Sequence, residues 1–182
     1  MKSLSKNANL TKKVCFCAVC LALAFVLPFV TGAIPEIGGA LCPMHLPAFL
    51  SGALLGPIFG GLVAFISPLL RGIIFGSPVV FPRGISMAFE LLTYSVIFGA
   101  LYRRLPKKLG FIYPSLLLAM LAGRIVGGAA KLILLAFGVI AEYGWRLFFT
   151  AYFVETLPGV IVQLVIIPPV MRALERTKLT VE

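Results

Sequence analysis

Long apolar segments joined by short connections dominate this chain and limit what it can fold into. Of its 182 residues, 60% are hydrophobic and 12% are charged, whereas a soluble domain averages about 45–50% apolar and about 25% charged residues. A helix needs about 20 apolar residues to cross a bilayer. We therefore expect an all-α integral membrane protein with room for six spans and no soluble catalytic domain.

Six apolar segments can be delimited along the chain. They cover residues 14–32, 47–55, 59–70, 82–102, 112–140 and 145–174. The second and third are shorter than a full span and are separated by Gly56-Pro57, so we expect shortened, tilted or closely paired helices there. Pro82 suits a helix start, whereas prolines inside the last segment should kink it, at Pro158, Pro168 and Pro169.

Basic residues gather at alternate ends of these segments. They lie before the first segment (Lys2, Lys6, Lys12, Lys13), between the fourth and fifth (Arg103, Arg104, Lys107, Lys108) and after the sixth (Arg172, Arg176, Lys178). With six spans all three groups lie on one side of the membrane, which the positive-inside rule identifies as the cytoplasm. With five spans one basic group would lie outside. We expect a cytoplasmic N-terminal segment 1–13, a six-helix domain 14–174 and a cytoplasmic tail 175–182. The net charge of +10 then reflects topology rather than nucleic-acid binding.

Several ionisable residues interrupt the apolar segments. A charge at membrane depth costs about 2.5–3.5 kcal/mol on insertion scales and normally faces the protein interior or a wet cavity. Three pairs of polar residues are spaced by seven or eight positions, so each pair should share a helix face: Arg83 and Glu90, Arg124 and Lys131, and Glu155 and Gln163. If these three faces converge, they line one polar cavity.

The balance of these charges favours an anionic ligand. The cations Arg71, Arg83, Arg124 and Lys131 stand against the carboxylates of Glu90 and Glu155. Pairing all of them leaves a surplus of about two positive charges, unless Arg71 and Arg83 extend to the surface. The alternative interpretation is a set of structural ion pairs that hold the helices in register, such as Arg124 with Glu90 or Lys131 with Glu155.

Other residue patterns exclude several chemistries. The chain has no phosphate-binding G-x-x-x-x-G-K-[ST] loop, no G-x-S-x-G or H-E-x-x-H motif, no Asp and one His. Cys17-x-x-Cys20 lies in an apolar segment, where cysteine behaves as a small hydrophobic residue, so we expect neither a metal nor a cofactor. His45 is interpreted as a loop hydrogen-bond partner or a ligand contact. Four aromatic residues are interpreted as packing or interfacial groups: Tyr94, Trp145, Phe148 and Tyr152. The alternative for Trp145 and Phe148 is that they lie near the outer mouth and cover an organic ligand.

Small residues spaced by four predict close contact between helices. The spacing occurs in Ala18-x-x-x-Ala22, in Gly123-x-x-x-Gly127 and in the series Gly52, Gly56 and Gly60.

Three stretches of the chain resemble one known family. Residues 43–57, PMHLPAFLSGALLGP, resemble the loop and second helix of the substrate-binding (S) components of energy-coupling-factor (ECF) transporters. The same family is matched by residues 76–82, which precede the helix carrying residues 87–91. It is also matched by Pro158-Gly159 and the later Gln163. The similarity extends over about residues 10–174.

The resemblance implies a function for the chain. S components are six-helix proteins of the bacterial plasma membrane that bind a vitamin or related micronutrient from outside and catalyse no reaction. They dock on a transmembrane coupling protein that carries two cytoplasmic ATPases, through an A-x-x-x-A pattern on the first helix, which Ala18 and Ala22 match. Their ligand pocket lies between helices four to six, under two loops that correspond here to residues 34–46 and 71–81. Glu36 and His45 fall in the first of these loops.

The ligand is not given by the family. The cationic surplus favours pantothenate as the ligand. Arg124 would bind its carboxylate, and Lys131 would add to the positive electrostatic field. Glu90 or Glu155 would orient the two cations. Folate-like, nicotinate-like and queuosine-type ligands remain open, and a queuosine-type base would use the glutamates instead. Two other classes of function are a self-contained carrier or channel, although no internal repeat is evident, and a membrane enzyme with Glu90 and Glu155 as acid and base.

Overall fold

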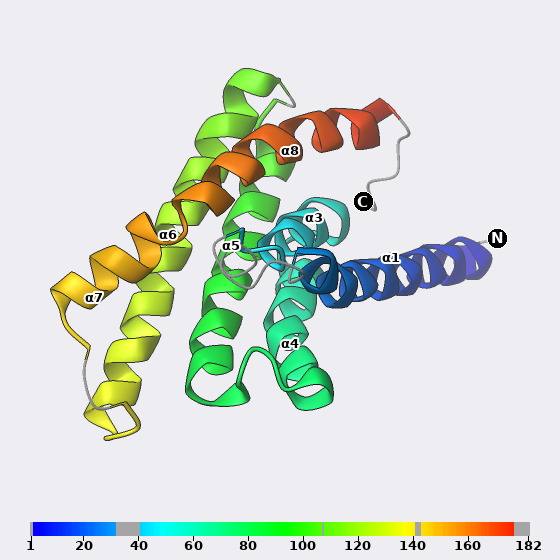
Figure 1. Cartoon of the computed structure of the whole chain (residues 1–182). Helices are drawn as coiled ribbons and strands as arrows, with labels where there is room; N and C mark the ends of the chain where they lie inside the picture. The colour runs from blue at the N-terminus through cyan, green and yellow to red at the C-terminus, as the bar shows by residue number, and fades with distance from the viewer. Residues whose placement is uncertain (1, 32–40, 107, 141–142, 177–182) are drawn as a thin grey trace.

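Helices make up the regular structure of this protein wherever it is described. The computed structural model describes residues 2–31, 41–106, 108–140 and 143–176, with side chains from residue 10 onward (Figure 1). The expectations for Glu36, for the cations Lys107 and Lys178, and for tail residues 177–182 fall outside these residues. The elements are α1 (Lys2–Thr31), α3 (His45–Leu55), α4 (Pro57–Phe75), η1 (Val80–Gly84), α5 (Ile85–Arg104), α6 (Leu109–Ala136), α7 (Trp145–Phe149), η2 (Thr150–Val154) and α8 (Leu157–Arg176).

Five stretches of helix are long and apolar enough to cross a membrane. They are Leu10–Thr31, Pro57–Phe75, Val80–Arg104, Leu109–Ala136 and Trp145–Arg176. The sixth apolar helix, α3, has 11 residues and is only about 17 Å long at 1.5 Å per residue, against a hydrocarbon core of about 30 Å. Most of α3 is buried inside the bundle. The chain is thus the all-α membrane bundle that the sequence predicts, with a short, enclosed second helix.

The break between α3 and α4 occurs where the sequence predicts it. Gly56 has a φ of 84°, which favours glycine, and ends α3, and Pro57 begins α4. A methyl group added at Gly52 would lie 2.3 Å from the backbone oxygen of Ser95. The Ser51 hydroxyl reaches both the Gly60 carbonyl (3.1 Å) and the Ser95 hydroxyl (3.2 Å). The prediction that these small residues bring helices into close contact is confirmed for α3, α4 and α5.

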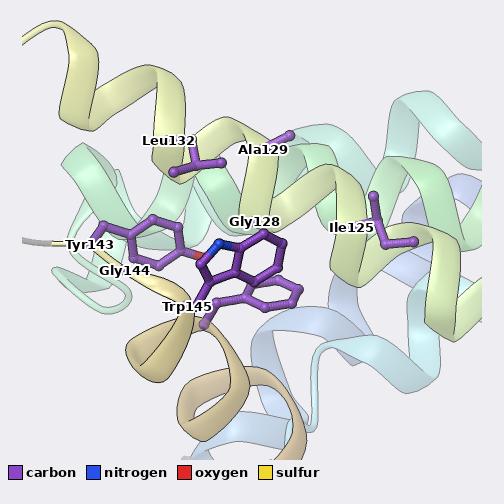
Figure 2. A pocket seen from close by; sticks show the side chains of 8 residues that line it. Ile125, Gly128, Ala129, Leu132, Tyr143, Gly144 and Trp145 are labelled. Atoms are coloured by element: carbon purple, nitrogen blue, oxygen red, sulfur yellow. The ribbon is translucent and has the colours of Figure 1, made fainter.

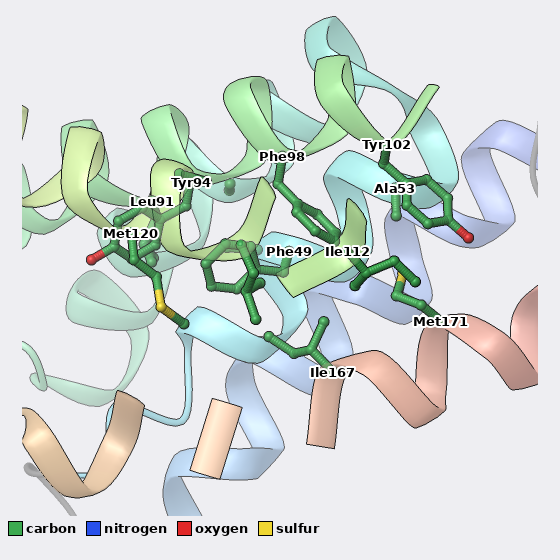
Figure 3. Close-up of a cluster of buried hydrophobic side chains, with 14 of the residues drawn as sticks. Phe49, Ala53, Leu91, Tyr94, Phe98, Tyr102, Ile112, Met120, Ile167 and Met171 are labelled. Atoms are coloured by element: carbon green, nitrogen blue, oxygen red, sulfur yellow. The ribbon is translucent and has the colours of Figure 1, made fainter. Parts of the chain in front are cut away.

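A ladder of aromatic rings along α5 forms the centre of the core. The Phe49 ring of α3 stacks on Tyr94, with ring centroids 5.1 Å apart, and meets Phe98 edge-on at 5.4 Å. Phe98 stacks in turn on Tyr102 at 5.7 Å. Figure 3 shows the side chains from α6 and α8 that surround this ladder, which are Ile112, Met120, Ile167 and Met171. This packing holds the Tyr94 ring in place beside Glu90.

The last apolar segment is not one kinked helix. It consists of α7, the π-helical turn η2, a turn at residues 155–156 and then α8. The predicted interruption at Pro158 is found, because the helical run breaks at residues 155–156 and Pro158 lies in the first turn of α8 that follows. Pro168 and Pro169 do lie inside α8, whose ribbon bends along its length (Figure 1).

Helix α1 contacts the bundle along one face only. Cys20 and Ala24 are each 1% exposed and pack inward, and Cys20 joins a small apolar cluster with Leu54 and Val63. The N-terminal part of α1 extends away from the other helices (Figure 1). Ala18 and Ala22 lie on its exposed side.

Candidate functional site

A buried carboxylate on α5 is the centre of the candidate site. Glu90 is 7% exposed, and its Oε1 accepts a 2.7 Å hydrogen bond from the Tyr94 hydroxyl one turn later. His45, at the start of α3, places Nε2 3.6 Å from the same oxygen. The imidazole of His45 also packs against the Tyr94 ring, with centroids 5.2 Å apart. Two helices distant in sequence therefore meet at one carboxylate.

Two glycines allow α6 to approach this carboxylate closely. A methyl group at Gly123 would lie 2.1 Å from the Tyr94 ring, and one at Gly127 would lie 3.3 Å from Glu90 Oε2. The Gly127 position is also close to the Tyr152 hydroxyl, at 3.0 Å. The prediction of close packing at Gly123-x-x-x-Gly127 is confirmed. This contact places the polar residues of α6 beside Glu90.

The two cations of α6 share a face, as their spacing predicts, and both meet the chain that runs from α7 to α8. Arg124 donates from Nη2 to the Thr156 hydroxyl (3.1 Å), and its guanidinium lies 5.2 Å from the Phe153 ring centroid. Lys131 places Nζ 4.4 Å from the centroid of the Tyr152 ring, a cation–π distance. Neither cation forms an ion pair with a carboxylate in the described part of the chain.

The loop before α3 lies within the electrostatic field of this site. Burial raises the pKa of the Cys42 thiol to about 12; the Glu90 carboxylate adds to this rise, and Arg124 and Arg83 oppose it. Cys42 also accepts the backbone N–H of His45 at 3.0 Å through its carbonyl. Cys42 thus belongs to the rim of the site. We name the inner residues the Glu90 cluster: His45, Glu90, Tyr94, Arg124, Lys131 and Tyr152.

Two residues that the sequence placed on shared polar faces are more exposed than their partners. Arg83 is exposed while Glu90 is buried, and Glu155 is exposed while Gln163 is 3% exposed. Each pair thus joins an exposed and a buried residue, and Arg83 and Glu155 still lie within electrostatic range of Lys131. Arg83 lies in π-helical η1, next to the non-helical Phe81, and Glu155 lies in the turn that separates η2 from α8.

Arg71 is buried at a different place. It is 6% exposed on α4, donates to the Ser77 carbonyl, and lies 5.2 Å and 5.8 Å from the ring centroids of Phe29 and Phe75. These aromatic faces and the carbonyl stabilise its charge locally. Of the four cations that the sequence predicts around one cavity, two belong to the cluster, Arg124 and Lys131.

The sequence interpretation missed the part that two tyrosines play. Tyr94 and Tyr152 were expected to act as packing or interfacial aromatics, yet one bonds Glu90 and the other lies beneath Lys131. The i, i+4 spacing of Glu90 and Tyr94 is a signal that both lie on one helix face. No comparable spacing connects Tyr152 to Lys131, because they come from different helices.

Unpartnered polar atoms remain in and beside the cluster. Arg124 Nε and His45 Nδ1 are buried and have no hydrogen-bond partner among the described residues. Buried polar groups are nearly always hydrogen-bonded in native proteins, since leaving one unpaired costs roughly 1–3 kcal/mol. With two cations, one buried carboxylate and polar atoms left without partners, the arrangement suits reversible binding of a polar molecule.

The fold and the cluster together define a small helical membrane protein with polar residues gathered between its helices. Residues 12–171 match the family described as ECF transporter, substrate-specific component, so the chain belongs to this family. It is a multi-pass membrane protein and a transport subunit, not an enzyme. The family associates with an ECF membrane and ATPase module and binds a small-molecule ligand. Searches of curated proteins and of solved structures found no match.

Proposed function

We propose that the Glu90 cluster binds a small organic monoanion taken up from outside the cell, with pantothenate as the first candidate. The observation that carries this proposal is that Arg124 and Lys131 lie together on α6 without a carboxylate partner in the described chain. A cation at membrane depth without a counter-ion is costly, and both residues lie within the span Leu109–Ala136. An anionic ligand removes that cost.

The charge count selects among the candidate ligands. The two cations and the buried carboxylate of Glu90 leave a formal charge of one positive unit among these three residues. A ligand with one carboxylate, such as pantothenate or nicotinate, balances it. A folate-like ligand with two carboxylates would leave the site negative, and a cationic queuosine-type base would increase the positive charge unless Glu90 alone held it.

Each residue of the cluster has a distinct proposed role. The planar guanidinium of Arg124 can donate two parallel hydrogen bonds to a carboxylate. Lys131 adds a compact charge whose attraction to the ligand depends less on direction. Glu90, held by Tyr94, would accept a ligand hydroxyl or amide N–H, and His45 would close the site from α3. Gln163 remains a candidate contact because it is buried on α8. Arg83 and Glu155 are proposed only as contacts at the outer rim.

Transport itself would need partners. We propose that the subunit docks through the exposed face of α1, at Ala18 and Ala22, on a transmembrane coupling protein that carries two cytoplasmic ATPases. The chain would then lie in the bacterial plasma membrane with both termini in the cytoplasm. ATP hydrolysis on the partner subunits would provide the energy for import.

Binding by the purified subunit tests the proposal. Radiolabelled pantothenate should bind in detergent, unlabelled nicotinate should compete measurably, and Arg124→Ala should weaken binding by about 2–5 kcal/mol, at least about 30-fold. Arg124→Lys should retain an intermediate affinity, because charge remains but the two parallel hydrogen bonds are lost. Arg104→Ala, which removes an exposed arginine at the other end of α5, is the matched control. Equal affinity in Arg124→Ala and Arg104→Ala would remove Arg124 from the site.

Native mass spectrometry of the purified protein provides an independent check. A co-purified ligand with one carboxylate would support the proposal, and a cationic or uncharged one would contradict the role given to the α6 cations.

A further inference from the structure

The apolar groove between α6 and α7 is not independent of the Glu90 cluster. It has a volume of about 390 Å³, and Tyr143 and Trp145 face α6 across it (Figure 2). Lys131 of the cluster places Nζ 5.7 Å from the centroid of the Tyr143 ring, so the groove adjoins the proposed ligand site. The buried charge for which that site does not account is Arg71 of α4.

Arg71 connects three parts of the chain. Its guanidinium carbon lies 5.2 Å from the ring centroid of Phe29 on α1 and 5.8 Å from that of Phe75 at the end of α4. The two rings meet edge-on, with centroids 5.0 Å apart. From the same guanidinium, Nη1 donates a hydrogen bond to the Ser77 carbonyl in the turn that follows α4. Arg71 therefore links α1, α4 and this turn.

These contacts take the place of a counter-ion for Arg71. The residue is 6% exposed in the span Pro57–Phe75, forms no ion pair with a carboxylate in the described part of the chain, and leaves its Nε without a hydrogen-bond partner there. A charge at this depth is costly, and apolar residues often replace buried ionic groups without loss of stability. An apolar side chain could fill the same space. It could not donate to Ser77, which is the contact that an arginine adds.

The segment after α4 has little other support. Of residues 77–84, only Gly84 is buried. The segment approaches α4 most closely at Gly72, where an added methyl group would lie 2.5 Å from the Pro78 carbonyl oxygen. Segments with few buried apolar contacts open at a low free energy. The hydrogen bond from Arg71 is therefore well placed to order this segment.

The same segment carries Arg83, whose charge acts on the ligand site. Arg83 lies within electrostatic range of Lys131 in the Glu90 cluster and of Cys42 at its rim. The N–H of the next residue, Gly84, donates to the Val79 carbonyl at 2.9 Å, which connects the backbone at Arg83 to the turn. The position of the turn therefore determines where the positive charge of Arg83 lies relative to the cluster.

We propose that Arg71 is a positioning residue for ligand binding, which ties the turn after α4 to Phe29 of α1 and so holds Arg83 at the rim of the Glu90 cluster. The inference rests on the proposed function, because the charge of Arg83 attracts the ligand only if the ligand is an anion. Arg71 itself does not contact the ligand. Because Phe29 belongs to the helix proposed to dock on the coupling protein, the same contacts transmit a movement of α1 to Arg83.

A nitroxide label on the segment tests this anchor without any ligand. Val79, which is 63% exposed, is replaced by cysteine and labelled in a protein whose native cysteines are alanine. Arg71→Met keeps an apolar chain of similar length but removes the donor, and it should sharpen the EPR spectrum of the label, which reports greater mobility. Phe29→Leu should sharpen the spectrum to a smaller extent. Val30→Leu, at a 69% exposed position of α1, is the control and should leave it unchanged.

Two results of this experiment would overturn the proposal. An unchanged spectrum in Arg71→Met would show that the arginine does not order the segment. A Phe29→Leu spectrum equal to that of Val30→Leu would show that α1 has no part in the anchor, and this comparison decides the matter if Arg71→Met cannot be purified.

Pantothenate binding then tests the action through Arg83. Arg71→Met should weaken binding about 3–10-fold when Arg83 is present, but by less than about twofold in an Arg83→Gln background. Arg71→Lys should recover part of the affinity, because a charged donor remains. Equal losses in both backgrounds would overturn the action through Arg83, since a merely structural role of Arg71 would not depend on it. If the wild type binds no pantothenate, the proposed ligand is wrong, and the EPR spectra still decide whether Arg71 anchors the segment.

Discussion

The Tyr94 hydroxyl donates a 2.7 Å hydrogen bond to Oε1 of Glu90, from one turn further along the same helix. This bond stabilises a carboxylate that is 7% exposed inside a membrane bundle. The Tyr94 ring is held on both sides, by stacking on Phe49 at 5.1 Å and by the close approach of Gly123. The aromatic core therefore positions the central polar group of the site before any ligand arrives.

Replacing Tyr94 by Phe should destabilise the protein. The change leaves the ring in place but removes the donor to Glu90, and a hydrogen bond to a charged group contributes about 1.5–3 kcal/mol. We expect the free energy of unfolding in detergent to fall by that amount, with a lower Tm. Tyr113→Phe is the matched control, because Tyr113 is 41% exposed on α6 and its loss should change stability by less than about 0.5 kcal/mol. An equal effect of both substitutions would show that the Tyr94 bond contributes nothing.

Gly123→Ala should disturb the site through packing alone. The added methyl group would lie 2.1 Å from the Tyr94 ring, so α5 and α6 must separate or the ring must move, at a cost of about 1–3 kcal/mol. Gly110→Ala on the same helix has no atom within 4 Å of the new methyl group and should be neutral or stabilising, because alanine favours helix. Thermal unfolding measures both. A Gly123→Ala protein as stable as Gly110→Ala would contradict the close contact.

Hydrophobic length and breaker residues were sufficient to predict most of the fold. The apolar segments correspond to the helices, and Gly56-Pro57 separates α3 from α4 as expected. The errors lie where the helix is irregular. Helical periodicity assumes 3.6 residues per turn. Arg83 lies in the π-helical turn η1 and Glu155 in the turn before α8, so counting along an ideal helix did not predict that both are exposed.

The site was only partly predictable for a related reason. Spacing within α6 correctly placed Arg124 and Lys131 together. It could not show that Arg71 lies elsewhere, against Phe29 and Phe75, because that depends on which helices are neighbours. The contact between Lys131 and Tyr152 likewise joins two helices and has no signature in the local sequence.

A bulky residue on the exposed face of α1 should separate binding from transport. Ala18→Trp and Ala22→Trp place a large ring on an outward face, so the isolated subunit should fold and bind ligand normally, while uptake in cells with an ECF module should be lost. Leu118→Trp, at a 53% exposed position of α6, is the control and should support uptake. Normal uptake by both alanine variants would show that this face of α1 is not the docking surface.

The reactivity of Cys42 should report the charges of the cluster from its rim. Burial and the Glu90 carboxylate raise the thiol pKa to about 12 from 9.0, so at pH 8 the reactive thiolate should be about a thousandfold scarcer than for an ordinary thiol, and alkylation by iodoacetamide correspondingly slow. The rate should keep rising with pH beyond 9. In a protein whose other cysteines are alanine, Glu90→Gln should accelerate alkylation because it removes a negative charge, whereas Arg124→Ala should slow it because it removes a positive one. Changes of the same sign in both variants would indicate altered access to Cys42 rather than the electrostatic field of Glu90 and Arg124.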